Sequence, residues 1–255
     1  MTGQVEDLGD RLVVTNDNPG KRNALTPDYY AALGAALDMA PEPRIGAVIL
    51  RGAGGYFCAG GDLAALATRR DLSRAGRLEK IGALHDLIAA IHACPVPVIA
   101  VVEGGAAGAG ASIAFAADLL VAARDATFTA AYVRAGLVPD GGLTASLAGL
   151  VPRATLMRMA LVGDRITADR LHALGAITDL CARGQADATA HALADRLCAG
   201  PRDAQTAIKR LVRTVYGDPT DQTERERQAM ADAQVHPEGV EGIDAFLGKR
   251  KPMWR

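Results

Sequence analysis

The chain has 255 residues, with 28 Lys and Arg against 29 Asp and Glu, so its formal net charge is −1, and 49% of its residues are hydrophobic. This balance excludes a general electrostatic attraction for nucleic acid or for an anionic membrane, and any basic site must be local. The length and the mean hydropathy of +0.10 are typical of a soluble enzyme with one domain, or with one domain and an appendage.

Further classes of protein are excluded by the apolar stretches, the N-terminus and the cysteines. Proline or charged residues interrupt each long apolar stretch, so none is predicted to span a bilayer. The N-terminus lacks the basic and then apolar pattern of a signal peptide. The four cysteines are too widely spaced for a Cys-x-x-Cys motif, and they predict neither a disulfide framework nor a metal site. We therefore expect a cytoplasmic protein with reduced cysteines.

Strand and helix patterns alternate as far as about Leu150. Thr26 and Pro27 form the N-cap and the first position of a predicted helix. Apolar runs rich in β-branched residues predict buried strands, and apolar residues at helical spacing predict helices. In chain order, the predicted elements are a strand at Asp10–Thr15, a helix from Pro27 to about Met39, a strand at Ala47–Leu50, a helix at Gly76–His92 and a strand at Pro97–Val102.

Helical patterns take over beyond Pro152. The predicted helices are Ala154–Leu161, Ala168–Leu174, Ala186–Cys198, Ala204–Tyr216 and Gln222–Val235. The chain is therefore predicted to fold as an α/β core over residues 1–195, followed by a helical C-terminal lobe over residues 196–255.

Two loops of small residues, Phe57–Leu63 and Gly104–Ser112, each follow a predicted buried strand. Glycine and alanine leave backbone N–H groups uncovered. Two such donors converging on a carbonyl oxygen would form an oxyanion hole, a contribution of roughly 3–4 kcal/mol for each donor in acyl chemistry. The alternative is that both loops are only tight turns between strand and helix.

Six motifs in register resemble the crotonase (enoyl-CoA hydratase/isomerase) superfamily over essentially the whole chain. They are Arg22–Leu25, Phe57–Leu63, the strand and glycine turn of Pro97–Ser112, Ala117–Ala122, Gly136–Gly142 and Glu241–Arg250. The resemblance is closest to the subgroup labelled enoyl-CoA hydratase family or alternative-type oxepin-CoA hydrolase. It implies a spiral of ββα turns, a C-terminal lobe that forms a homotrimer or a dimer of trimers, and an acyl-CoA substrate. Coenzyme A would then be part of the substrate, with no permanently bound cofactor.

The resemblance also implies where the oxyanion hole and the acid/base group lie. The hole would be the backbone N–H groups of Gly61 and Ala109. Enoyl-CoA hydratases carry two glutamates at positions that are Ser112 and Tyr132 here, so ordinary hydration lacks its usual pair of carboxylates. Asp140 remains, at the place where some members carry their acid/base carboxylate or nucleophile. Its alternative role is to N-cap the next helix.

Three other side chains keep two interpretations each. His85 matches the position of an active-site histidine in a dehalogenase of the family, and is either a general base or proton relay, or a structural residue on an amphipathic helix. Tyr132 either hydrogen-bonds a substrate or fills space. Cys58 is either a reactive thiol or, as we expect, a small buried side chain in the first loop.

Contacts to coenzyme A are implied at two ends of the chain by the matching motifs. The implied contact residues are Lys21, Arg22, Ala24, Ala59, Phe246 and Lys249. The basic residues among them would pair with phosphates. Alternatively, Lys21 and Arg22 are solvated loop charges. Asp62 is expected to shape the first loop without reacting.

These residues suit a one-base isomerase, or a related lyase, in which Asp140 moves a proton while the hole holds an enolate. The first alternative is an enoyl-CoA hydratase or a CoA-ester ring hydrolase that uses Asp140 together with His85. The second is a homologue that binds acyl-CoA without turnover.

Overall fold

The computed structural model describes the chain except for residues 70, 216–236, 239–240, 242–244, 246–247 and 254–255. Its strands form a larger sheet in the order β1-β2-β3-β4-β6-β9 and a smaller sheet in the order β5-β7-β8. The strands are β1 (Gly3–Asp7), β2 (Arg11–Asn16), β3 (Ala47–Gly52), β4 (Val98–Val102), β5 (Gly105–Ala107), β6 (Leu119–Ala123), β7 (Thr127–Thr129), β8 (Arg165–Thr167) and β9 (Asp179–Cys181).

The larger sheet is parallel from β2 to β9, and β1 joins its edge antiparallel to β2. Strands β3 and β4 are neighbours, with Val48 paired to Val98 and Leu50 paired to Ala100. Because neighbouring parallel strands end at the same edge of a sheet, the loops that follow β3 and β4 emerge side by side. The topology thus brings the two glycine loops to one edge.

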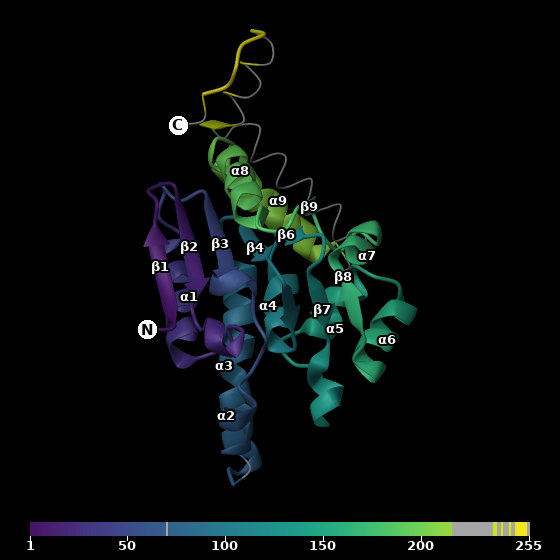
Figure 1. Cartoon of the computed structure of the whole chain (residues 1–255). Coiled ribbons are helices and arrows are strands. Elements are labelled where there is room, and N and C mark those ends of the chain that lie inside the picture. The colour runs from purple at the N-terminus through teal and green to yellow at the C-terminus, as the bar shows by residue number, and fades with distance from the viewer. Residues whose placement is uncertain (70, 216–236, 239–240, 242–244, 246–247, 254–255) are drawn as a thin grey trace.

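Helices cover both faces of the larger sheet (Figure 1). They are α1 (Pro27–Met39), α2 (Leu63–Ala67), α3 (Arg74–Ala93), α4 (Ala109–Ala116), α5 (Leu143–Ala148), α6 (Arg153–Val162), α7 (Ala168–Ala173), α8 (Ala186–Cys198) and α9 (Arg202–Thr214), with short 3₁₀ turns η1 (Pro19–Lys21), η2 (Ala53–Gly55) and η3 (Ala131–Ala135). In Figure 1, α2 and the beginning of α3 project from the lower end of the molecule, and α8 lies across its upper part.

The alternation of side chains along β3 divides the core into two clusters. Val48 and Leu50 point into a large cluster with α1, α3 and α4, whereas Ile49 joins a smaller one against α8. The α8 side of that smaller cluster is made by Ala190 and other fully buried alanines. Such small side chains let a helix lie close to a sheet of β-branched residues, which keeps the packing dense.

The predicted elements that fall within the described residues are present close to their predicted bounds, whereas short strands such as β1, β5 and β7 were not predicted. The Thr26 side chain caps α1 by accepting a hydrogen bond from Tyr29 N, and α8 has the predicted bounds. Beyond Pro152, where helical patterns take over in the sequence, the structure also contains the strands β8 and β9, which were not predicted. Each has three residues, too few for a periodic pattern to emerge.

Two predictions about the C-terminal region remain predictions. The helix at 222–235 falls outside the described residues. The boundary after residue 195 falls within α8, and nothing in the structure tests the division into core and lobe.

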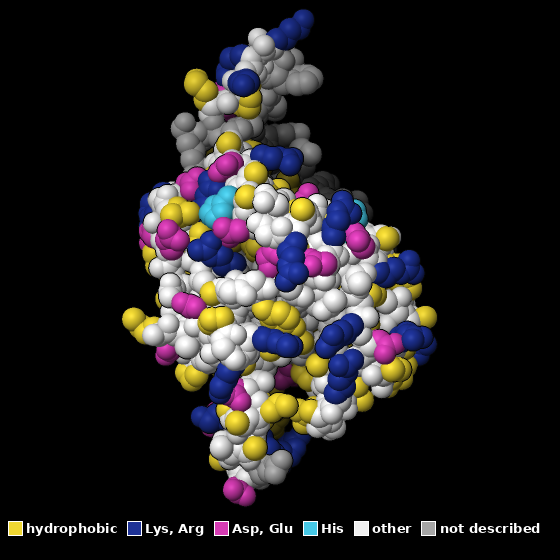
Figure 2. All heavy atoms as spheres, in the orientation of Figure 1, with side chains coloured by type: hydrophobic (Ala, Val, Ile, Leu, Met, Phe, Trp, Pro, Cys, Tyr) yellow, Lys and Arg dark blue, Asp and Glu magenta, His cyan; other side chains and the backbone are white. Residues whose placement is uncertain are grey.

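Acidic and basic side chains are interleaved on the surface. Figure 2 shows Lys and Arg scattered among Asp and Glu on this face and not gathered into one patch, as the net charge of −1 leads one to expect. No helix within the described residues combines the length and the apolar character that crossing a bilayer requires.

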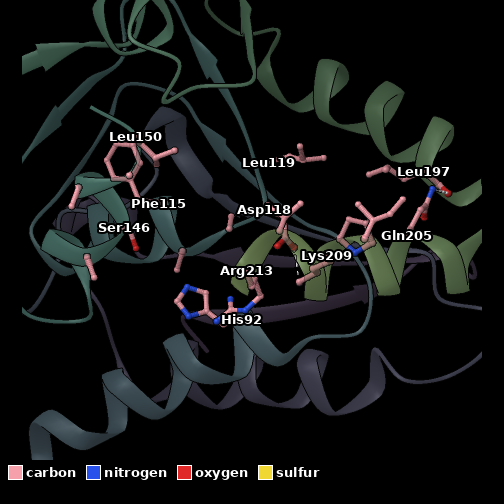
Figure 3. A pocket seen from close by; sticks show the side chains of 18 residues that line it. His92, Phe115, Asp118, Leu119, Ser146, Leu150, Leu197, Gln205, Lys209 and Arg213 are labelled. Carbon is pink, nitrogen blue, oxygen red and sulfur yellow. Dashed lines mark hydrogen bonds and ion pairs between the residues drawn. The ribbon is translucent and has the colours of Figure 1, made fainter. Parts of the chain in front are cut away.

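A buried ion pair links α9 to the segment between α3 and β4 and to the residues just before β6 (Figure 3). Lys209 Nζ lies 2.6 Å from Asp118 Oδ2 and also donates to the carbonyl oxygens of Ile91 and Val96. The same Asp118 oxygen accepts from Val98 N at the start of β4. The Lys209 side chain is only 7% exposed, so each of its partners replaces lost water.

Replacing one partner of this pair should therefore destabilise the fold strongly. We expect Lys209→Met to lower the free energy of unfolding by about 3–5 kcal/mol, because it leaves Asp118 as a buried carboxylate without its cation. Chemical denaturation measures the change. The double variant Lys209→Met/Asp118→Asn should recover most of the loss, and a double variant as unstable as the single one would contradict this account.

Candidate active site

The two glycine loops are joined by backbone hydrogen bonds. Ala107 N donates to Cys58 O over 2.9 Å, and Phe57 N donates to Gly105 O over 3.1 Å. Cys58 and Ala106 form a parallel bridge between the loops. The start of the first loop therefore pairs with β5 as a parallel strand would, and this pairing fixes the positions of the two loops relative to one another.

The predicted oxyanion-hole residues lie at this junction. Gly60 has a φ of +93°, and a Cβ there would lie 2.7 Å from Ala107 O and 3.1 Å from Ala109 N, so only glycine fits. This close approach brings the residue before Gly61 against Ala109 N. Ala109 opens α4, and its N–H has no intrahelical acceptor. Within the described residues, neither Gly61 N nor Ala109 N donates a hydrogen bond.

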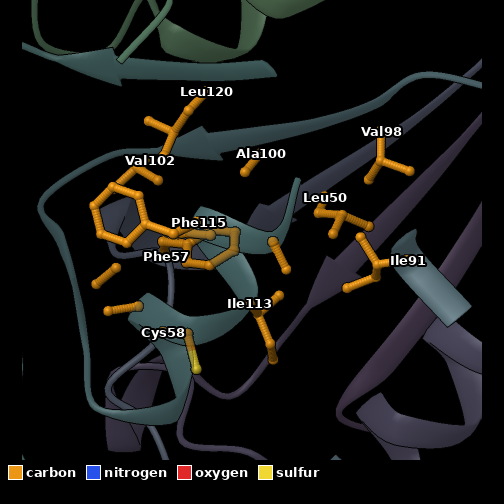
Figure 4. Close-up of a cluster of buried hydrophobic side chains, with 14 of the residues drawn as sticks. Leu50, Phe57, Cys58, Ile91, Val98, Ala100, Val102, Ile113, Phe115 and Leu120 are labelled. Carbon is orange, nitrogen blue, oxygen red and sulfur yellow. The ribbon is translucent and has the colours of Figure 1, made fainter. Parts of the chain in front are cut away.

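The thiol of the first loop is part of the core. Cys58 is 2% exposed and lies with Phe57 among apolar side chains that include Ile113 and Phe115 of α4 (Figure 4). Burial raises the pKa of the Cys58 thiol to about 12. A thiol that stays protonated is a poor nucleophile, so the expected interpretation as a small buried side chain is confirmed.

Asp140 does not cap a helix. The N-cap of α5 is Gly142, and no side-chain hydrogen bond caps that helix. The Asp140 carboxylate instead accepts a hydrogen bond from the Tyr132 hydroxyl, with 2.8 Å between Oη and Oδ1. Its main-chain oxygen accepts from Ser112 Oγ over 2.9 Å. Capping of the next helix by this side chain is therefore ruled out.

Ser112 and Tyr132 are the two positions where the resemblance implies glutamates, and both hydroxyls meet Asp140. Their oxygens lie 2.9 Å apart. Ser112 is fully buried on α4, one turn after Ala109, and Tyr132 comes from η3. A Cβ on Gly108 would lie 4.0 Å from Tyr132 Cζ, so the phenol ring lies beside the N-terminus of α4.

This chain of contacts links the Asp140 carboxylate to the helix that carries Ala109. Sequence reasoning considered Tyr132 only as a substrate contact or a space filler and missed this partnership. The available signal was that both hydroxyl residues occupy positions expected to face the reacting group.

His85 contacts the same turn from α3. Its Nε2 accepts a hydrogen bond from Gly141 N over 3.3 Å, which means that a neutral ring carries its proton on Nδ1. A Cβ at Gly141 would come within 3.0 Å of Leu84 and Ser112, so the turn is packed tightly between α3 and α4. The structure thus places His85 against Gly141, the residue after Asp140, while its role as a base stays a prediction.

Four of the six residues expected to contact coenzyme A lie in the first loop or beside it. Ala59 N donates to Arg22 O over 2.9 Å, and Leu25 N, next to Ala24, donates to Gly60 O over 2.8 Å. The Arg22 guanidinium lies 5.9 Å from the centre of the Tyr56 ring.

Lys21, the fourth, is paired with the first loop itself. Its Nζ lies 2.8 Å from Asp62 Oδ2, and this pairing lowers the pKa of the Asp62 carboxyl. Asp62 also caps α2 by accepting from Ala64 N, which confirms that it shapes the loop.

The other two are not brought to this group. Phe246 falls outside the described residues. Lys249 is exposed, and Figure 1 places the described C-terminal segment above α8, at the opposite end of the molecule from α2.

A pocket of about 900 Å³ lies between α9, α5 and the end of α4, and none of the predicted site residues lines it. His92 does line it (Figure 3). Burial first, then the charges of Arg213 and Lys209, lower the pKa of His92 to about 4. Among the described residues, no group of three or more His, Cys, Asp or Glu is arranged to hold a metal ion.

The similarity to known proteins covers the whole region that contains the six motifs. A family model described as enoyl-CoA hydratase/isomerase matches residues 11–255. The chain is 37% identical over 243 residues to a "Probable enoyl-CoA hydratase" of Rhodobacter capsulatus, covering 94% of this chain and 92% of the relative. It is 32% identical over 250 residues to a 1,2-epoxyphenylacetyl-CoA isomerase of Escherichia coli, covering 95% and 94%.

The solved structures agree with the sequence relatives. The crystal structure of an enoyl-CoA hydratase from Polaromonas sp. JS666 superposes with a TM-score of 0.95 at 40% identity, over 99% of each chain. The predicted resemblance and the predicted fold class are both confirmed. The chain belongs to the enoyl-CoA hydratase/isomerase family, the crotonase superfamily, and is an enzyme of that family acting on CoA thioesters.

Proposed function

We propose that this enzyme isomerises an acyl-CoA thioester with Asp140 as its single acid/base group. The backbone N–H groups of Gly61 and Ala109 would hold the thioester oxygen. Lyase chemistry of the same type would use the same groups, with a leaving group departing from the enolate.

The observation that carries the proposal is the Asp140 carboxylate with its hydroxyl partners. Where a pair of glutamates would serve hydration, Ser112 and Tyr132 present hydroxyls, and both bind Asp140. Hydration needs one group to activate water and another to deliver a proton. Moving a proton from one carbon to another needs only one base, and the Asp140 carboxylate is hydrogen-bonded to the phenol that lies beside the N-terminus of α4.

The reaction balances with a single shuttled proton. Asp140 removes the proton from carbon 2 of a 3-enoyl-CoA, and the electron pair moves onto the thioester oxygen to form a dienolate. The Gly61 and Ala109 N–H groups stabilise that negative charge. Asp140 then returns the proton to carbon 4, the double bond shifts to carbons 2 and 3, and the carboxylate is regenerated.

The names of the relatives support both this reaction and its main alternative. The Escherichia coli relative is named as an isomerase, and a relative from Salmonella enteritidis, 30% identical over 257 residues, is named carnitinyl-CoA dehydratase. The relative from Rhodobacter capsulatus is named as a hydratase. Hydration here would require His85, which contacts the Asp140 turn through Gly141 N, as the second group.

Coenzyme A would bind as the carrier of the acyl group beside the first loop. Lys21 and Arg22, which lie next to that loop, would pair with its phosphates. The described C-terminal segment that includes Lys249 lies above α8 in Figure 1, at the opposite end of the molecule from α2, so we propose that Lys249 contacts coenzyme A bound to a neighbouring subunit. Exposed apolar side chains on α6 and α9, such as Leu161 and Val212, support assembly into a homotrimer or a dimer of trimers.

Asp140→Asn should abolish proton transfer without abolishing substrate binding. We expect the rate of double-bond migration in a 3-enoyl-CoA, and of deuterium uptake from heavy water, to fall by roughly 100-fold or more. Mass spectrometry measures both, with crotonyl-CoA as a second substrate. Full activity of this variant, or formation of 3-hydroxyacyl-CoA as the main product, would sink the one-base proposal.

Gly60→Ala should damage the oxyanion hole, because its Cβ would push against Ala107 O and Ala109 N. Gly175→Ala is the matched control, since Gly175 has a similar φ of +86° but nothing within 4 Å of a Cβ. Both changes should cost about 1–2 kcal/mol of unfolding free energy from backbone strain. Only Gly60→Ala should slow deuterium uptake, by roughly 100-fold, and equal rates for the two variants would argue against the hole.

The assembly can be measured directly by light scattering on the eluting protein. We expect a mass of three or six chains. Leu161→Glu and Val212→Glu place a charge on the apolar surfaces and should shift the mass toward one chain. A monomeric unsubstituted protein would rule out the proposed trimer and the contact of Lys249 with a neighbour's substrate.

A further inference from the structure

The proposed reaction assigns no step to the hydroxyl of Tyr132, although this group contacts the proposed base directly. Tyr132 Oη lies 2.8 Å from Asp140 Oδ1 and 2.9 Å from Ser112 Oγ. Within the described residues, no hydrogen bond reaches Asp140 Oδ2. The two oxygens of the carboxylate are therefore in different surroundings.

We propose that Tyr132 is a positioning residue, whose hydroxyl holds Asp140 Oδ1 so that Oδ2 alone takes and returns the substrate proton. The inference rests on the proposed function, because it assumes that Asp140 is the base. It assigns Tyr132 neither substrate contact nor mere filling of space.

The direction of the hydrogen bond between Tyr132 and Asp140 follows from which of the two groups carries a proton. An ionised carboxylate has no proton to donate, so the Tyr132 proton lies toward Oδ1. Ser112 then has its own proton for the Asp140 main-chain oxygen or for the phenol oxygen. Burial first, and then the Asp140 charge, raise the pKa of Tyr132, while the Ser112 contact opposes them. The phenol therefore keeps its proton at neutral pH and acts as a hydrogen-bond donor.

The same arrangement decides where the proton is stored between the two half-reactions. When the carbon–hydrogen bond at carbon 2 breaks, a new O–H bond forms at Oδ2, because Oδ1 faces the phenol proton. The O–H bond at Oδ2 then breaks as the bond at carbon 4 forms. Tyr132 keeps its own proton throughout. The hydrogen delivered to carbon 4 is consequently the one taken from carbon 2, unless it exchanges with water while it is on Oδ2.

The backbone of the turn is held mainly by groups other than Tyr132, whose hydroxyl lies a longer 3.4 Å from the main-chain oxygen of Asp140. Ser112 Oγ holds the main-chain oxygen of Asp140, and His85 Nε2 holds Gly141 N. Removing the phenol hydroxyl therefore frees the torsions of the Asp140 side chain and leaves its Cα in place. Tyr132→Phe should fold normally, and its effect should be confined to the orientation of the carboxylate.

The test uses 3-enoyl-CoA deuterated at carbon 2, in ordinary water, with four enzymes. These are the unsubstituted protein, Tyr132→Phe, Asp140→Asn and the double variant. Mass spectrometry gives the rate of double-bond migration and the fraction of product that retains deuterium at carbon 4. Tyr29→Phe is the control, since it removes the hydroxyl of another buried tyrosine, which belongs to α1, is 1% exposed and points into the core.

We expect Tyr132→Phe to lower kcat by roughly 10-fold, as for loss of a hydrogen bond to a charged group, with KM within about twofold. The retained fraction of deuterium should also fall, because a rotating carboxylic acid exposes its proton to water. That fraction is a ratio of products, so it does not depend on how much enzyme is folded. In the Asp140→Asn background, Tyr132→Phe should cause no further loss, because Tyr132 acts through Asp140.

Each other result overturns the inference in a recognisable way. If Asp140→Asn is inactive while Tyr132→Phe keeps both rate and deuterium retention, the positioning role fails and the proposed function stands. If the effects of the two substitutions multiply, Tyr132 acts on the substrate or on the fold. If Asp140→Asn is fully active, or the unsubstituted enzyme moves no proton in 3-enoyl-CoA, the proposed function and the inference fall together.

Discussion

The candidate site depends on the backbone hydrogen bonds that join the loop after β3 to β5. Main-chain donors and acceptors near Cys58 and Gly105 pair as in a parallel sheet, and this pairing holds the two glycine loops in register. Without this pairing, nothing would keep the N–H groups of Gly61 and Ala109, which come from distant parts of the chain, close to one another. Glycine at position 60 is the condition for this contact, because any Cβ there would meet the neighbouring loop.

Helix α4 connects the glycine loops to Asp140, the proposed acid/base group. Its first residue, Ala109, offers the N–H group proposed for the hole, and one turn later Ser112 holds the backbone of Asp140. The helix is buried on all sides, so its position is set by core packing and not by solvent-facing contacts. The donor proposed for the hole belongs to α4, and the carboxylate proposed for proton transfer belongs to a residue that α4 holds by a hydrogen bond, which limits how far either can move from the other.

The hydroxyls of Ser112 and Tyr132 restrict the position of Asp140. A lone aspartate on an exposed turn would sample several rotamers and would share its proton freely with water. Here its main chain and one carboxylate oxygen are both bound, from α4 and η3. The family likeness establishes the class of enzyme, whereas the proposal of one-base chemistry comes from these contacts and from the absence of a glutamate at either position.

Much of the fold was predictable from local pattern. The N-cap at Thr26 and the apolar run of β3 are local signals, and six motifs in order identified the family. The short strands β8 and β9 escaped prediction because three residues carry no period and depend on the strands beside them. Of the candidate site, the sequence named residues whose roles stay predictions, but it did not reveal the partners of Asp140.

The sequence by itself determined the longer helices and the buried strands with a clear apolar run, and the family to which the chain belongs, because these depend on periodicity, capping and residue order. Only the tertiary structure decided that Tyr132, eight residues before Asp140, turns its hydroxyl onto that carboxylate, and that Ser112 reaches the same residue from a helix 28 positions away. The physical reason is that these contacts depend on how η3 and the turn after it pack against α4, and no local pattern encodes that packing.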